Sequence, residues 1–249
     1  MGILRIQNLT KSFKKLTAVS GLALEVKKGE VLGLMGPNGS GKTTVINLIT
    51  GFLNPDSGLI KWHDEDITGW KPYKIVQKGI ARTFQQARVF PNMSIFDNVV
   101  ISLAKAKRSC LSLKQDHKQK ALEILNWVDM KTKPSTLASQ LPQNELRKLE
   151  IARAMGSDPE LILLDEPVSG LTPEESDSIA KVITRLNETG VTLIVIEHVM
   201  RMLMKISHRL IVMNSGMKVC EGSPEEVRVN PTVIEAYFGK GEEEFVNFG

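Results

Sequence analysis

Apolar and polar residues alternate near the start of the chain in the manner of half-buried β-strands. Residues 4–9 read Leu-Arg-Ile-Gln-Asn-Leu and residues 22–26 read Leu-Ala-Leu-Glu-Val, which is the period of two that a strand requires. Continuous apolar runs follow at 31–35, 161–165 and 191–196. Such runs are typical of parallel strands that are buried on both faces. We also expect a strand at 80–84 and a hairpin that joins 209–213 to 218–220 around Asn214-Ser215-Gly216.

Helical periodicity takes over in the middle of the chain. It predicts three helices at 95–105, 116–128 and 145–155. Because they fall between apolar strand segments, they indicate a helical block inserted into an α/β sheet protein. The other expected features are helices at 41–51, 173–187, 224–229 and 231–238, a turn at 55–58 and a frayed tail around 241–244.

A glycine-rich segment stands between the apolar run at 31–35 and the helix that follows. It reads Gly36-Pro37-Asn38-Gly39-Ser40-Gly41-Lys42-Thr43 and runs directly into Thr44. The glycines let backbone N–H groups turn around a polyphosphate, and the helix N-terminus adds its positive dipole. In such a loop Lys42 reaches the β- and γ-phosphates and the Thr43 hydroxyl ligates Mg²⁺. The alternative is a plain turn before a buried helix, and the strand and helix on either side favour the phosphate-binding loop.

Polar side chains end three of the other expected strands. Asp165 and Glu166 follow 161–165, where one acid can hold Mg²⁺ through a water and the other can orient or deprotonate an attacking water. His198 follows 191–196, at the sheet edge where ligands of α/β folds bind, so we expect it to contact the γ-phosphate. Gln85 follows 80–84 and can offer its carbonyl to Mg²⁺ and hold the water. The alternatives are a solvent-facing acidic strand end, a structural histidine and an ordinary loop glutamine.

Composition narrows the class of protein only slightly. The chain has 249 residues, a net charge of +4 and a sequence pI near 9.0, and its scattered lysines indicate a solvated face more than a nucleic-acid or membrane patch. Cys110 and Cys220 share no metal-ligand spacing, which indicates a reduced compartment. We expect no signal peptide. The apolar runs are far shorter than the ~20 residues that cross a bilayer, so any membrane partner must supply its own spanning helices.

Taken together and in this order, the motifs resemble those of an ATP-binding cassette (ABC) ATPase. They are the phosphate-binding loop, Gln85, Leu164-Asp165-Glu166-Pro167, the segment 169–172 and His198. The resemblance covers essentially the whole chain. The segments 82–85 and 149–155, and the C-terminal 222–237, further resemble the ATPase subunits of importers for branched-chain amino acids and for urea or amides.

This resemblance implies a fold and a division of the chain. The fold would be a P-loop NTPase (RecA-like) α/β core with an antiparallel β subdomain and an inserted α-helical subdomain. The catalytic core would span about 1–86 and 158–222, the helical subdomain about 87–157, and a short helical extension about 223–249. The phosphate-binding loop and the strand ending in Asp165-Glu166 would be its Walker A and Walker B motifs.

The same resemblance implies roles for individual residues. Phe13 would stack on adenine, the alternative being a plain core side chain. Glu166 would be the catalytic base and His198 the γ-phosphate switch, with Gln85, Thr43 and Asp165 at the Mg²⁺ site. The segment 87–99 would couple to a membrane partner. The remaining assignments are the nucleotide-binding residues Gly36, Pro37, Asn38, Gly39, Ser40, Gly41, Lys42, Thr43 and Thr44, and the dimer-interface residues Ser169, Gly170, Leu171 and Thr172.

One segment departs from the family pattern. The family's signature, usually Leu-Ser-Gly-Gly-Gln or Leu-Ser-Tyr-Gly-Glu, falls here on Leu141-Pro142-Gln143-Asn144-Glu145. Pro142 replaces the serine that meets the γ-phosphate of the opposite subunit, and Asn144 replaces the glycine that permits close backbone approach. Proline is tolerated at a helix start. The departure therefore concerns what this chain contributes to a partner's ATP site rather than its fold.

The function that the resemblance implies is hydrolysis of ATP with Mg²⁺ to power an importer of branched-chain amino acids or a related small polar solute. The partners would be a paralogous ATPase subunit in a heterodimer, with a homodimer as the other arrangement, transmembrane permease subunits and, indirectly, a substrate-binding protein, but no nucleic acid. The place would be the cytoplasmic face of the cell membrane. Two rivals remain: an ABC ATPase that acts on ribosomes or DNA without transport, and a regulatory module that binds ATP with slow turnover.

Overall fold

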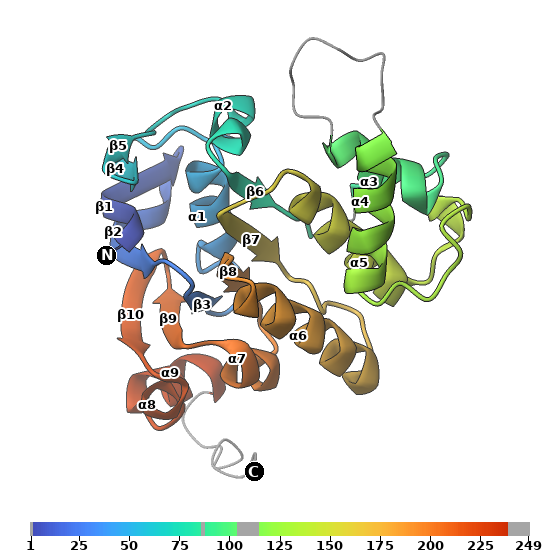
Figure 1. Ribbon diagram of the computed structural model, residues 1–249. Coiled ribbons are helices and arrows are strands. Elements are labelled where there is room, and N and C mark those ends of the chain that lie inside the picture. Colours follow the sequence, from blue (N-terminus) through green and yellow to red (C-terminus); the bar gives the residue numbers. More distant parts are fainter. Residues whose placement is uncertain (1, 86–87, 104–114, 239–249) are drawn as a thin grey trace.

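A computed structural model describes residues 2–85, 88–103 and 115–238, which form two sheets flanked by helices (Figure 1). The larger sheet has six strands in the order β10-β9-β3-β8-β7-β6. Neighbouring strands from β9 to β6 are parallel, and only β10 pairs antiparallel. The six strands are β3 (Val31–Met35), β6 (Ile80–Arg82), β7 (Leu161–Asp165), β8 (Thr192–Ile196), β9 (Arg209–Asn214) and β10 (Met217–Gly222). This confirms the α/β prediction and the closing hairpin.

The continuous apolar strands are buried on both faces. In β7, Leu161 and Leu163 pack on one side while Ile162 and Leu164 pack on the other, because successive side chains of a strand point in opposite directions. One face packs on α1 (Lys42–Ile49) and the smaller sheet, and the other on α6 (Pro173–Glu188) and α7 (Met200–Ile206). The two apolar layers hold the carboxyl ends of β3, β6, β7 and β8 at one common edge.

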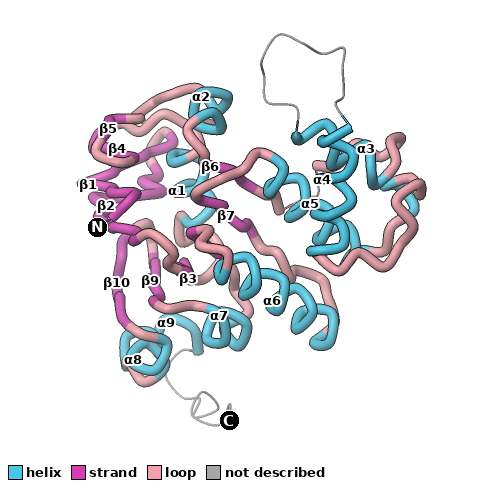
Figure 2. Tube along the Cα trace, viewed as in Figure 1, coloured by secondary structure: helices cyan, strands magenta, loops and turns pink. Residues whose placement is uncertain are grey.

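The smaller sheet is antiparallel, in the order β2-β1-β4-β5 (Figure 2). Its strands are β1 (Gly2–Phe13), β2 (Leu16–Lys27), β4 (Ser57–Trp62) and β5 (Glu65–Asp66). The turn expected at 55–58 is wrong in its second half, because Ser57 already begins β4. Gly58 has φ +94°, and a Cβ there would lie 2.5 Å from the Asn8 carbonyl oxygen. The glycine thus serves close strand approach rather than chain reversal.

The three central helices pack together beside the larger sheet (Figure 1). They are α3 (Ile95–Leu103), α4 (Gln115–Trp127) and α5 (Gln143–Gly156), with a 3₁₀ turn η1 (Ala138–Gln140) before α5. Their predicted positions are confirmed over the described residues. Arg147 of α5 donates to the Phe84 carbonyl 3.3 Å away, so α5 also contacts the loop that follows β6.

The sequence pattern did not predict two short helices, α2 (Pro72–Gln77) and α7. Neither has a capping side chain at its N-terminus, although α2 begins with Pro72, so the strongest start signal is missing from both. The C-terminal helices α8 (Pro224–Arg228) and α9 (Pro231–Phe238) are confirmed. Ala87, the end of the expected helix at 105, Cys110 and the tail at 241–244 lie outside the described residues. Over the described part of the chain, no helix is both long and apolar enough to span a bilayer.

Candidate nucleotide site

The phosphate-binding loop leaves β3 and enters α1 as the sequence predicts. Gly41 caps α1 with φ +102°, and a Cβ at this position would lie 2.3 Å from the Ala18 carbonyl oxygen. Only glycine fits both the left-handed backbone and this close contact. Ser40 is buried, Thr44 is half-buried, and Asn38, Gly39 and Thr43 are exposed. The loop therefore presents its tip and the Thr43 end of the helix to solvent.

Lys42 folds back onto its own loop. Its ammonium donates to the carbonyl oxygens of Gly36 (2.7 Å) and Pro37 (2.9 Å) and lies 3.4 Å from the Ser40 hydroxyl oxygen. Burial lowers the pKa of Lys42 from its ordinary value of 10.5, while the nearby carboxylates of Glu166 and Asp165 act in the opposite direction. The two carboxylates therefore favour the charged form of Lys42, and a charged ammonium is what binding a phosphate requires.

Asp165 ends β7 in a fully buried position. Its Oδ2 accepts a hydrogen bond from Arg82 Nη2 at 2.9 Å, and the two side chains are 1% and 8% exposed. Burial raises the pKa of Asp165, and the Arg82 guanidinium partly offsets this rise. Sequence reasoning missed Arg82. The available signal was an arginine on a strand that is otherwise apolar.

Glu166, the next residue, adopts a left-handed backbone with φ +50°. This region is sparsely populated by residues other than glycine, and such conformations cluster at functional sites. The Glu166 amide donates to the Ile196 carbonyl at 2.9 Å, which ties it to the end of β8. The Gln85 side-chain amide donates to Glu166 Oε2 at 2.9 Å. The structure thus brings together Gln85, Asp165 and Glu166, as the strand-end argument predicts.

His198 follows β8 and is exposed. Its neighbour Glu197 is completely buried, and accepts hydrogen bonds from the backbone amides of Val168 (2.8 Å) and His198 (3.2 Å). Burial raises the pKa of the Glu197 carboxyl. Glu197 joins the segment after Glu166 to the segment that holds His198, a connection that the sequence did not indicate.

Phe13 lies at the end of β1 and its ring is 44% exposed, so the alternative of a core side chain is wrong. The Lys11 ammonium lies 5.8 Å from the centre of the ring. The exposed ring is available for stacking.

The signature segment forms the start of α5. Pro142 is the N-cap residue with no side-chain capping bond, and the Asn144 Oδ1 accepts from the Glu145 amide at 2.8 Å. Gln143 Nε2 donates to the Ser169 carbonyl oxygen at 2.9 Å, so the signature contacts the segment Ser169–Thr172. Leu141 and Glu145 are buried. Proline is accommodated without disturbing the helix, as expected.

The residues at the Mg²⁺ position fit a hard cation held largely by phosphate. Within the described ranges, no three His, Cys, Asp or Glu residues form a metal-binding group. Asp165 Oδ1 is buried and has no hydrogen-bond partner among the described residues. Magnesium usually takes only one or two protein oxygens together with substrate phosphates, so a free carboxylate oxygen and the Thr43 hydroxyl suit it.

Comparison with known protein families gives two matches. The ABC transporter family model matches residues 19–169. The model described as "Branched-chain amino acid ATP-binding cassette transporter" matches residues 217–243.

Two relatives span nearly the whole chain. The high-affinity branched-chain amino acid transport ATP-binding protein BraF of Pseudomonas aeruginosa is 36% identical, covering 96% of this chain and 98% of BraF. The corresponding protein LivG of Escherichia coli K12 is 35% identical with the same coverage.

Solved structures are similar as well. An ATP-binding cassette of an ABC transporter in its ADP conformation superimposes with a TM-score of 0.88 at 31% identity, covering 96% of this chain and 100% of that one. A nucleotide-free cassette gives 0.87 at 32% identity, covering 97% and 100%. A dimeric cassette bound to ADP and Pi gives 0.80 at 26% identity, covering 89% and 98%.

Proposed function

Because this chain belongs to the ATP-binding family of ABC transporters, we propose that it hydrolyses ATP to power an importer of branched-chain amino acids or a related small polar solute. The observation that carries the proposal is the meeting of Lys42, Asp165, Glu166 and Gln85 at one sheet edge. The relatives named for branched-chain amino acid transport support the substrate class.

We assign each residue a step that its position allows. The loop amides and Lys42 bind the phosphates, and Phe13 stacks on the base. Glu166 accepts a proton from the attacking water, Gln85 orients that water, and His198 contacts the γ-phosphate. Hydrolysis of this kind depends mainly on positioning and charge neutralisation. Mg²⁺, held by Thr43, Asp165 and Gln85, supplies further charge neutralisation when bound.

We propose that two such subunits sandwich ATP, so that each site combines the phosphate-binding loop of one subunit with the signature of the other. The dimeric cassette with ADP and Pi supports a dimer. Pro142 and Asn144 favour a heterodimer, since a paralogue with an intact signature would complete the site built on Lys42. In a homodimer both sites would receive the altered signature.

The chain then acts at the inner face of the cell membrane, against permease subunits that provide the spanning helices. We retain the proposed division into a catalytic core of about 1–86 and 158–222, a helical subdomain of about 87–157 and an extension of about 223–249. The mutual contacts of α3, α4 and α5 support that division. The segment 88–99, the described part of the coupling region, is its proposed contact with the permease.

The test is reconstitution of the chain with its permease and binding-protein partners in vesicles. Vesicles with the wild-type chain should take up labelled leucine only when ATP and Mg²⁺ are present. Vesicles with Glu166→Gln in the same complex should take up none. A rate of ATP hydrolysis that the permease and binding protein leave unchanged, with no uptake of leucine, would contradict the transport role. Binding of ATP without turnover in the complete complex would favour a regulatory module.

A further inference from the structure

Arg82 is a buried cation that no proposed step of the reaction uses. Its guanidinium carries donors in a rigid plane, and four hydrogen bonds occupy these donors on three sides. Nη2 donates to Asp165 Oδ2 at 2.9 Å, Nη1 to Asn47 Oδ1 at 2.6 Å and to Thr50 Oγ1 at 3.3 Å, and Nε to the Thr83 carbonyl oxygen at 3.2 Å.

These bonds join elements that carry different parts of the nucleotide site. Asn47 lies in the last turn of α1, Thr50 caps the C-terminus of that helix, and Asp165 ends β7. Arg82 itself lies on β6, directly beside β7 and three residues before Gln85. α1, β6 and β7 meet in the middle of Figure 1. One side chain therefore sets the position of Asp165 relative to the phosphate-binding helix.

Two aromatic rings hold the guanidinium in place. Its central carbon lies 4.8 Å from the centre of the Phe84 ring and 5.6 Å from that of Phe52. The two rings contact each other edge to face, with their centres 5.6 Å apart. Arginine stacks on aromatic faces and bonds in its own plane at the same time, which a lysine ammonium cannot do.

The two oxygens of Asp165 consequently differ. Oδ2 is bound by Arg82, whereas Oδ1 is buried and has no partner among the described residues. A buried polar atom without a hydrogen-bond partner destabilises the folded protein. Because Arg82 holds the carboxylate through one oxygen, the group cannot rotate to bring the other oxygen to a donor. The unpartnered oxygen is thus presented in one fixed orientation.

We propose that Arg82 is a positioning residue, which holds Asp165 through Oδ2 so that Oδ1 is reserved for the magnesium ion of bound Mg-ATP or for a water on that ion. The inference rests on the proposed function, because it presumes that the site binds Mg-ATP. A positioning role for Arg82 and a purely structural ion pair lead to different dependences on magnesium. A structural pair supports the fold with or without magnesium, whereas a positioning residue matters most when magnesium is bound.

The experiment compares ATP affinity in excess Mg²⁺ with ATP affinity in EDTA, by calorimetry on wild type, Arg82→Lys and Asn47→Ala. Arg82→Lys keeps the positive charge but loses the planar guanidinium that reaches several partners at once. Changing a group that orients a metal ligand typically lowers metal affinity by about 10- to 100-fold, so the magnesium-dependent gain in affinity should fall by that order. Affinity in EDTA should stay within about twofold of wild type, since the phosphate contacts of Lys42 remain. Asn47→Ala, which removes only an anchor of Arg82, should give a smaller loss of the same kind.

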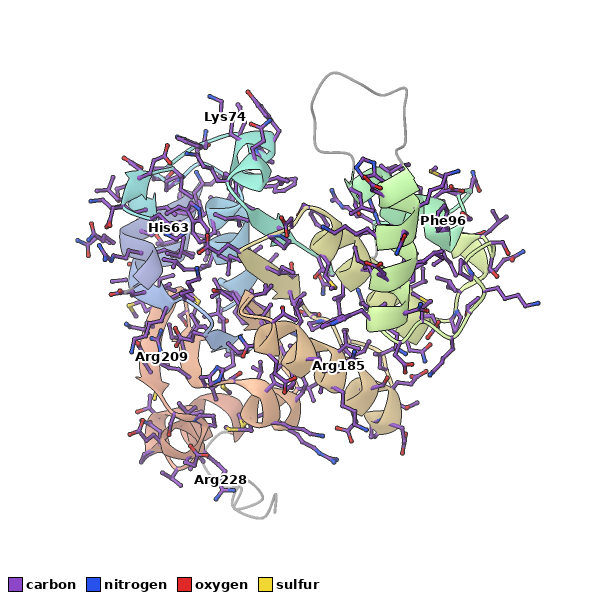
Figure 3. The ribbon with its side chains drawn as sticks, in the orientation of Figure 1. His63, Lys74, Phe96, Arg185, Arg209 and Arg228 are labelled. Atoms are coloured by element: carbon purple, nitrogen blue, oxygen red, sulfur yellow. The ribbon has the colours of Figure 1, made fainter. Side chains whose placement is uncertain are left out.

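The matched control is Arg209→Lys. Arg209, labelled in Figure 3, also pairs with a carboxylate through two nitrogens, at 2.7 and 3.1 Å from the two oxygens of Glu30, but at the start of β9, away from the loop that follows β3. Its magnesium-dependent gain should equal that of wild type. Thermal unfolding of each variant identifies any that fails to fold. If Arg82→Lys does not fold, the magnesium-dependent gain of Asn47→Ala tests the role of Arg82 instead.

Two results would overturn the inference alone: an unchanged magnesium-dependent gain in folded Arg82→Lys, or equal losses in Mg²⁺ and in EDTA. Wild-type protein that binds no ATP in either condition would instead overturn the proposed function, and this inference with it.

Discussion

The Gln85 side chain donates a hydrogen bond to the Glu166 carboxylate across 2.9 Å, although the two residues follow different strands of the sheet. Gln85 leaves β6 towards the three central helices, and Glu166 leaves β7 towards the segment Ser169–Thr172. The bond therefore joins the proposed base to the chain segment that would respond to the permease. A movement of that segment would release or hold the carboxylate.

Glu166→Gln should retain ATP binding and lose most hydrolysis. The amide can still accept the Gln85 hydrogen bond and adopt the same backbone, but it cannot take a proton, and general base catalysis typically contributes about 10²- to 10⁴-fold. Binding by calorimetry and steady-state phosphate release give the two quantities. Glu188→Gln, an exposed change on α6, is the control. Unchanged turnover in Glu166→Gln would remove this residue from the role of base.

Lys42→Ala should weaken nucleotide binding itself. A hydrogen bond to a charged group contributes about 1.5–3 kcal/mol, so we expect an affinity loss of that size in calorimetry. Lys181→Ala, which removes an exposed lysine on α6, should leave affinity unchanged. Equal affinities for all three proteins would show that the ammonium does not reach the phosphates.

Phe13→Ala should weaken ATP binding by about 1–3 kcal/mol, the range for stacking of a base on an aromatic ring. The ring is 44% exposed, so its removal should change the thermal midpoint little. Tyr73→Ala on α2, where the side chain is 61% exposed, controls for loss of a surface aromatic. A lower midpoint with unchanged affinity of the folded protein would contradict stacking.

Site residues could be predicted where one local sequence pattern specifies both the backbone conformation and the ligand-binding groups. The glycine loop is such a pattern, since Gly36 to Thr43 set the turn and the phosphate ligands together. The strand-end residues Gln85, Asp165 and His198 followed from the rule that parallel strands share one edge.

Long-range pairing was beyond the sequence. Arg82 and Asp165 belong to different strands, and although an arginine on an apolar strand signals a buried charge, nothing local to it indicates its partner. The β4 strand was missed because Asp56, Ser57 and Gly58 have turn propensity, which the approach of β1 overrides. Hydrophobic pattern describes which face is buried, whereas these contacts depend on which segments lie beside each other.

Restoring the signature with Pro142→Ser and Asn144→Gly should speed hydrolysis by the isolated chain. The hydroxyl and the closer backbone would each contribute ~1–3 kcal/mol to the transition state of the opposite site. Pro142→Ala with Asn144→Gly, which lacks the hydroxyl, should recover less. Addition of a paralogous subunit with an intact signature should speed the wild-type chain. Rapid turnover of isolated wild type, with no gain from restoration, would make Leu141–Glu145 a working signature.

Glu197→Gln should change how stability depends on pH. Burial raises the pKa of the Glu197 carboxyl in the folded protein, so the unfolded chain loses this proton at lower pH than the folded one. The contribution of Glu197 is then fully present below its unfolded pKa and is lost as pH rises through the folded pKa. The free energy of unfolding of Glu197→Gln, relative to wild type, should therefore improve from pH 4 to pH 7 in urea titrations. A difference independent of pH, like that expected for the exposed Glu188→Gln, would contradict this.

The contacts of Lys42 with Gly36 and Pro37 bear on how a nucleotide enters. The ammonium already donates hydrogen bonds to the carbonyl groups of its own loop, so an incoming phosphate must compete with these oxygens for the same donors. When a nucleotide binds, Lys42 exchanges carbonyl acceptors for phosphate oxygens, which lowers the net free energy that this contact contributes to binding. The carbonyl oxygens of Gly36 and Pro37 thus occupy the donors of Lys42 that a phosphate would otherwise take, so the affinity for nucleotide reports the difference between two sets of acceptors.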